Sequence, residues 1–123
     1  MNTGIVMIIL MLLPGGDFSS SFVNTDTLGE CEQRLGRIRP ILESGKVELK
    51  EAGCFQSTAE FDDFDHDPPA GAPRHTYLVD LKDGLATVRK LQTADECRAA
   101  LEEAERQTSY CATSTQDMTE GGN

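Results

Sequence analysis

The sequence predicts an α+β domain in which two capped helices pack on one face of a small antiparallel sheet, with one disulfide in each half. Three observations predict this fold class. Thr27 and Thr93 each open a Thr-x-x-Glu-Cys segment, in which the Thr and Glu side chains suit the start of a helix. Asp83-Gly84 lies between two alternating runs and predicts a two-residue hairpin. Four cysteines are available to tie these elements together in pairs.

Residues 1–21 are predicted to be a signal peptide that is removed on export. Residues 5–13 are all apolar, a length that is too short for a membrane-spanning helix but typical of the core of a signal peptide. Pro14 ends the run, and Ser19 and Ser21 suit the two subsites of a signal peptidase, so the mature chain is expected to start near Phe22. The alternative is an apolar strand or helix packed in a core. Cleavage predicts a periplasmic or secreted protein with no stable membrane insertion afterwards.

The rest of the chain divides into two halves, a connecting loop and a tail. In the first half, residues 22–58, we expect a helix over 28–44, kinked at Pro40 or losing its last turn there, and a strand over 46–50. In the second half, residues 76–111, we expect strands over 76–82 and 85–91, with Val79 facing Val88, and then a helix from Ala94. Residues 112–123 are polar, end in Gly and Asn, and are expected to be disordered.

The two halves read as a diverged internal repeat. Behind each Thr-x-x-Glu motif a cysteine is followed by apolar or small residues at the same helical offsets. This correspondence selects one pairing out of three, Cys31–Cys54 with Cys97–Cys111. Because so few residues lie between the second helix and Cys111, this pairing requires that helix to end by Glu105.

One part of the chain resembles a known group of proteins. A strand pair followed by Thr93, Cys97, an Ala-rich helix that includes Ala100, and Cys111 is similar to small signal-bearing, disulfide-containing proteins of proteobacteria and their phages. The resemblance covers residues 77–111. It implies export and disulfides and implies no activity, because those proteins are largely uncharacterised.

Composition argues against several classes of function. The net charge of −10 disfavours nucleic acid as a partner, because phosphate backbones are repelled. The cysteines are too widely spaced for a usual zinc site, and Cys-x-x-Cys is absent. A calcium loop starting at Asp63 would place Pro68 where Gly is needed and Arg74 where Glu is needed. His66 and His75, the two histidines, lie in the connecting loop with no nucleophile motif beside them. We therefore expect no cofactor, no metal and no catalytic residue.

The connecting loop, residues 59–75, is acidic in its first part and rich in Pro and Ala in its second. Phe61 and Phe64 lie among its acids and suggest a contact site for a protein partner, with the acids steering it. The residues expected to form this contact are Phe61, Asp62, Asp63, Phe64 and Asp65. The alternative is that both rings fold back and cover the domain.

These observations predict the class of function but no specific activity. We expect a small exported protein held by disulfides that acts as a non-enzymatic binding or structural module of the periplasm or extracellular space. The alternative is a small hydrolase that uses loop carboxylates, or an envelope factor encoded by a phage or prophage. The sequence leaves the oligomeric state open.

Overall fold

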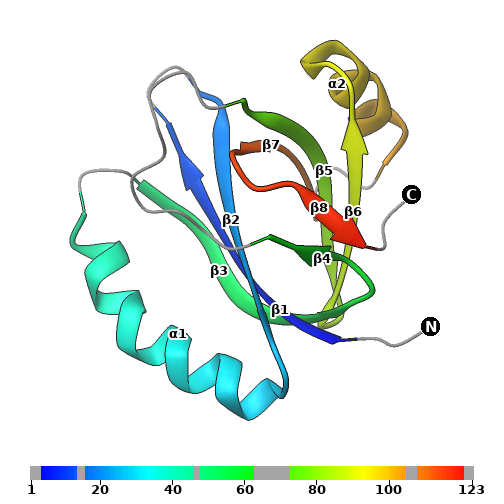
Figure 1. Cartoon of the computed structure of the whole chain (residues 1–123). Helices are drawn as coiled ribbons and strands as arrows, with labels where there is room; N and C mark the ends of the chain where they lie inside the picture. The colour runs from blue at the N-terminus through cyan, green and yellow to red at the C-terminus, as the bar shows by residue number, and fades with distance from the viewer. Residues whose placement is uncertain (1–3, 14–15, 46–47, 63–72, 105–107, 121–123) are drawn as a thin grey trace.

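The computed structural model of the chain describes residues 4–13, 16–45, 48–62, 73–104 and 108–120. Its main feature is a closed barrel of six strands in the order β1-β2-β7-β5-β6-β3 (Figure 1). These strands are β1 (Gly4–Leu12), β2 (Phe18–Thr25), β3 (Glu48–Ser57), β5 (His75–Lys82), β6 (Leu85–Leu91) and β7 (Ser109–Ser114). A separate two-stranded sheet joins β4 (Glu60–Phe61) to β8 (Met118–Glu120).

Two helices lie outside the barrel, far from each other in the view of Figure 1. Helix α1 (Leu28–Glu43) packs on β3 and β1, and helix α2 (Ala94–Glu103) packs on β5 and β7. The predicted fold class, two helices on one face of a small antiparallel sheet, is therefore wrong. The sheet closes on itself and its inner face forms the core, so the helices cover outer faces instead.

The two halves have the same order of elements and the same pairing. In the first half β1 pairs antiparallel with both β2 and β3, and in the second half β5 pairs antiparallel with both β6 and β7. Each half is thus a strand–strand–helix–strand unit with its first strand in the centre. Two short parallel seams join the units, Phe18 and Ser19 beside β7 and Gln56 beside Leu85 of β6.

Strand β1 is buried on both of its faces. Val6, Ile8 and Leu10 point into the barrel, where all three are fully buried. Met7 and Ile9 point outward and pack with Leu35 of α1. Because a strand covered on both faces needs no polar residues, it reads in sequence as a continuous apolar run, which is also the pattern of a signal peptide.

The structure thus places the predicted signal segment inside the fold, as in the alternative interpretation of an apolar strand in a core. Removal of residues 1–21 would delete β1 and the first four residues of β2, Phe18 to Ser21. A chain that starts near Phe22 therefore could not close this barrel. Cleavage of residues 1–21 stays a prediction, and it is incompatible with the fold described here.

Local predictions in both halves are confirmed. The side chains of Thr27 and Thr93 accept hydrogen bonds from the backbone N–H groups of Glu30 and Glu96, each over 3.1 Å. Helix α1 keeps its predicted start, but it runs through Pro40 to Glu43 as one helix and does not lose its last turn there, which was one of the two predicted effects of this proline. The hairpin has the predicted register, with Val79 opposite Val88.

The turn of that hairpin explains its sequence. Asp83 and Gly84 both have positive φ, 55° and 78°. This is the combination that the favoured two-residue turns require, and Asp-Gly tolerates it well. Strand β3 is longer than the predicted strand over residues 46–50 and runs from Glu48 to Ser57, while residues 46–47 lie outside the described part of the chain.

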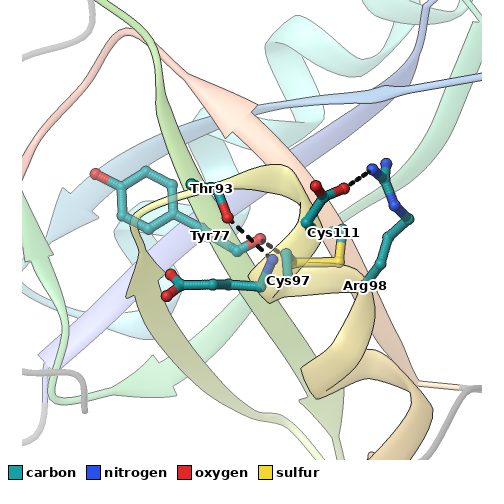
Figure 2. The surroundings of a disulfide bond; sticks show 7 residues. Tyr77, Thr93, Cys97, Arg98 and Cys111 are labelled. Atoms are coloured by element: carbon teal, nitrogen blue, oxygen red, sulfur yellow. Dashed lines mark hydrogen bonds and ion pairs between the residues drawn. A yellow bond between two sulfur atoms is a disulfide. The ribbon is translucent and has the colours of Figure 1, made fainter.

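Both predicted disulfides are present. Cys31 bonds Cys54 and Cys97 bonds Cys111, with Cα atoms 6.1 and 5.9 Å apart. Helix α2 ends at Glu103, as the second bridge requires. Figure 2 shows that bridge, with Thr93 at the start of the helix that carries Cys97 and with Tyr77 on the strand beneath it. In both halves the bridge joins the helix to the third strand of the unit.

The predicted disordered tail over residues 112–123 is wrong for the residues described, which extend to position 120. Ala112, Ser114 and Gln116 are buried, and Met118 packs against the barrel core. The Gln116 side chain substitutes for a neighbouring strand, because it accepts a hydrogen bond from the N–H of Phe22 (2.8 Å) and donates one to the carbonyl of Phe22 (2.7 Å). A polar sequence favours disorder, but here its polar groups satisfy the backbone of a buried strand.

The place of β1 in the core can be tested with two identical substitutions. We expect Ile8→Ala to lower the free energy of unfolding by about 2–5 kcal/mol, as for a fully buried aliphatic side chain. Ile41→Ala is the control, because Ile41 is 69% exposed, and it should change that free energy by no more than about 0.5 kcal/mol. Urea denaturation of the oxidised protein measures both. Equal, small effects would show that β1 is not part of the core.

Candidate functional site

Helix α1 is held against β3 on the outside of the barrel. The Cys31–Cys54 bridge fixes its second turn to that strand. Farther along, the Arg39 guanidinium donates a hydrogen bond of 2.9 Å to the carbonyl of Ala52 in the same strand. Because both ties lead to β3, α1 covers β3 and β1 and makes few contacts with β2. The outer face of the β1–β2 hairpin is therefore covered on one side only.

This arrangement leaves a groove of about 780 Å³ between α1 and the β1–β2 hairpin, here called the α1 groove. Its floor is formed by Met7, Ile9 and Met11 of β1 with Ser21 and Val23 of β2. Its wall on α1 consists of Arg34, Ile38, Ile41 and Leu42, and Phe22, Asn24, Phe61 and Asp62 line the rest. The volume lies within the range of pockets that hold small molecules, and the floor and wall are mainly apolar.

The second half of the molecule provides an internal comparison for this groove. Met7 pairs with Cys54, and Leu78 pairs with Cys111, so these two residues occupy the same place in the two units. Two residues farther on, the outward side chain is Ile9 in the first unit and Asp80 in the second. The Asp80 carboxylate accepts hydrogen bonds from the hydroxyl groups of Thr108 (2.6 Å) and Ser109 (3.1 Å).

The helices of the two units also differ, in this case in their length. Helix α1 has 16 residues and α2 has 10. The extra length of α1 carries Ile38, Ile41 and Leu42 along the apolar floor, and Ile41 remains 69% exposed there. The second unit thus folds with a short helix over a partly polar strand face. The apolar surface of the α1 groove is therefore more than this fold requires of a unit.

Asp62 lines the groove near the end of β2. The Asn24 side chain accepts a hydrogen bond from the N–H of Phe61 (2.8 Å) and donates one to the carbonyl of Ala59 (3.2 Å), which holds this segment beside β2. Asp62 in turn exchanges two hydrogen bonds with Asp117, through its own N–H (3.1 Å) and through its carboxylate (3.0 Å).

The predicted contact residues are thus separated by the structure. The Phe61 ring is stacked on Phe22 with ring centres 3.8 Å apart and lies edge-on to Tyr77, inside the core. The expectation that Phe61 is an exposed docking group is therefore wrong, and the alternative that this ring folds back holds for it. Asp62 is exposed at the groove, while Asp63, Phe64 and Asp65 lie outside the described residues.

A second cavity of about 420 Å³ is lined by basic residues at the start of β5 and near the end of β6. Its cations already have partners. Arg74 donates to the carbonyl of Thr113 and to the hydroxyl of Ser19, each over 3.2 Å, across the β2–β7 seam. Lys90 pairs with Asp117 over 2.7 Å, and its hydrogen bond lowers the pKa of that carboxyl. This cavity is better explained as part of the joint between the two units.

Sequence reasoning missed the residues of the α1 groove. Those of β1 are predicted to belong to a signal peptide, and Ile38 and Leu42 are among the apolar residues that follow Cys31 at helical offsets in the diverged repeat. One signal was present, because the run over residues 5–13 is apolar at odd and at even positions. Such a run indicates a strand that is covered on both faces as well as it indicates an exported leader.

His75 is the one histidine within the described residues, and there it forms no hydrogen bond with a serine hydroxyl or a carboxylate. Within the same ranges no three His, Cys, Asp or Glu side chains are grouped so that they could hold a metal ion.

The chain matches no protein-family model, curated protein or solved structure. Its two disulfides indicate an oxidising environment outside the cytoplasm. Neither helix among the described residues is long and apolar enough to cross a membrane.

Tyr77, which lies in the core beside Phe61, should make the free energy of unfolding depend on pH in the alkaline range. Burial, with the negative charge of Asp117, raises the pKa of Tyr77 from 10.0 to about 12, and the hydroxyl donates a hydrogen bond of 2.7 Å to the carbonyl of Gln116. The unfolded chain loses this proton first, so the free energy of unfolding should fall as the pH rises from 10 to 12.

The test compares wild type with Tyr77→Phe by urea denaturation below and above pH 10, the usual pKa of the phenol. The variant should be less stable at neutral pH by about 1 kcal/mol, because the buried Gln116 carbonyl loses its donor. It should also lose less stability at high pH than wild type does. The same alkaline loss in both proteins would contradict the assignment to Tyr77.

Proposed function

We propose that the protein is an exported, non-enzymatic binding module of the periplasm or extracellular space, and that the α1 groove is where it holds a small, mainly apolar ligand. The observation that carries the proposal is the contrast between the two units. They share topology and disulfide placement, but only the first combines an apolar outer strand face with a helix long enough to form a groove wall.

Burial of this apolar surface under a ligand would contribute a favourable free energy of binding. Ile41 is 69% exposed and lies beside the half-buried side chains of Met11 and Ile38. Removing apolar surface from water contributes about 25 cal/mol for each Å². A ligand that fills the groove gains this contribution without rearrangement of the barrel, because the disulfide and Arg39 already hold α1 in place.

The protein partner predicted for the acidic loop is not part of this proposal. Phe61, one of its two apolar anchors, is in the core. The oxidising environment that the disulfides indicate supports export, and the proposal assigns the ligand to that compartment.

Binding can be tested with Nile red, an uncharged dye that fluoresces in apolar surroundings. We expect saturable binding to the native, oxidised protein, and Ile41→Gln should weaken it about tenfold, the effect of losing one apolar contact surface. Leu85→Gln is the matched control, because Leu85 is also exposed (52%) but lies on β6, outside the groove. Fluorescence titration gives both dissociation constants.

Two results would contradict the proposal. The first is an absence of saturable binding to the wild-type protein while its urea midpoint shows that it is folded. The second is equal weakening by Ile41→Gln and Leu85→Gln, which would mean that the dye binds to exposed apolar side chains in general.

A further inference from the structure

The α1 groove contains one cation within its apolar wall. Arg34 lies four residues before Ile38, so both side chains occupy the same face of α1. Within the described part of the chain, the Arg34 guanidinium has no hydrogen-bond or ion-pair partner. Arg39 on the same helix is used for packing against β3, so the groove wall holds a charge that the fold does not use.

The charges give the groove a direction. Asp62 lies close to Phe22 of β2, because the Gln116 side-chain amide donates to the carbonyls of both residues (2.8 and 2.7 Å), and the chain enters α1 from the end of β2 (Figure 1). From Arg34 the helix carries its groove face about 10 Å farther to Ile41, away from that end. A ligand with a negative head would therefore place the head at Arg34, and its apolar part would run towards Ile41 and Met11, where the lining is uncharged.

We propose that the ligand of the α1 groove is a free single-chain amphiphile with a carboxylate head, bound with the head at Arg34 and the alkyl chain along β1. This inference rests on the proposed function, because it names the ligand class of the same groove. The planar guanidinium group matches a carboxylate with two parallel hydrogen bonds. An alkyl chain matches the floor of Met7, Ile9 and Met11.

The net charge of −10 acts against an anionic ligand, but only at long range. At physiological ionic strength charges more than about 8 Å apart are largely screened, so the nearest cation has the largest influence on the head. Asp62 is the acid that lines the groove, and its carboxylate accepts the hydrogen bond from the N–H of Asp117. As the acid of the groove it opposes an anionic head, and the two parallel hydrogen bonds that Arg34 offers a carboxylate have to outweigh this repulsion.

The experiment compares three ligands with the same alkyl chain, namely dodecanoate, dodecanol and dodecyltrimethylammonium. Each displaces Nile red from the oxidised protein below its micelle-forming concentration, at a pH where the carboxylate is ionised. We expect dodecanoate to bind about tenfold more tightly than dodecanol, the contribution of one charge-assisted hydrogen-bonded contact. The trimethylammonium compound should bind most weakly.

Two variants assign the difference to one residue. Arg34→Gln should remove the advantage of dodecanoate, so that the ratio of the two affinities in this variant falls to about one. Arg37→Gln is the control, because Arg37 is exposed on the same helix but does not line the groove, and it should change neither affinity. Both sites are exposed, so the urea midpoints of the variants should match that of wild type.

The outcomes separate this inference from the proposed function. Equal binding of dodecanoate and dodecanol, or an advantage of dodecanoate that survives Arg34→Gln, overturns the carboxylate head and leaves an apolar groove. Tightest binding of the cationic compound overturns it as well and assigns the head to Asp62. Failure of all three ligands to displace a dye that does bind shows that the alkyl chain does not fit. Absence of dye binding removes the proposed function itself.

Discussion

The burial of β1 on both faces is the constraint on which the rest of the structure depends. Its inward side chains, Val6, Ile8 and Leu10, fill the barrel, and its outward side chains form the surface on which α1 lies. It also pairs with both β2 and β3, so the first unit has no sheet without it. The barrel can close only because this central strand supplies an inner face that complements that of β5 in the second unit.

Closure itself relies on little backbone pairing. The seam between β2 and β7 has two residue pairs, and the seam between β3 and β6 has one. Side chains extend the first seam, since Arg74 bridges Ser19 and Thr113 and the Gln116 amide bonds both backbone groups of Phe22. Each unit is stapled internally by its own disulfide, whereas the joint between units depends on the shared core and on these polar contacts.

The repeated topology also shows where the two units have different tasks. Half of the molecule satisfies the fold with a short helix and with Asp80 on the outer face of its central strand. The other half keeps an apolar outer face, a longer helix and a groove between them. A feature that one unit has and the other does without is a better candidate for function than a feature both share. The α1 groove meets this criterion.

Prediction from the sequence succeeded where the signal is local. The helix caps at Thr27 and Thr93, the turn at Asp83-Gly84 and the end of α2 each depend on a few neighbouring residues. The disulfide pairing followed from the correspondence of two segments.

Prediction is weakest where distant parts of the chain decide the outcome. An apolar run has the same sequence pattern whether it is a strand buried between two layers of the protein or a signal peptide recognised during export. The polar residues around Gln116 do not reveal that they complete a strand 94 positions away. The groove could not be predicted for the same reason, because its floor and its wall come from segments for which the sequence predicts different roles.

One measurement tests the central claim most directly. Hydrogen–deuterium exchange followed by mass spectrometry, on the disulfide-bonded protein isolated after export, reports whether β1 belongs to the folded molecule. The account predicts that peptides covering residues 6–10 are present and that their amides exchange only when the whole protein unfolds. A mature chain that begins near Phe22, or a β1 peptide that exchanges as fast as unfolded chain, would contradict it.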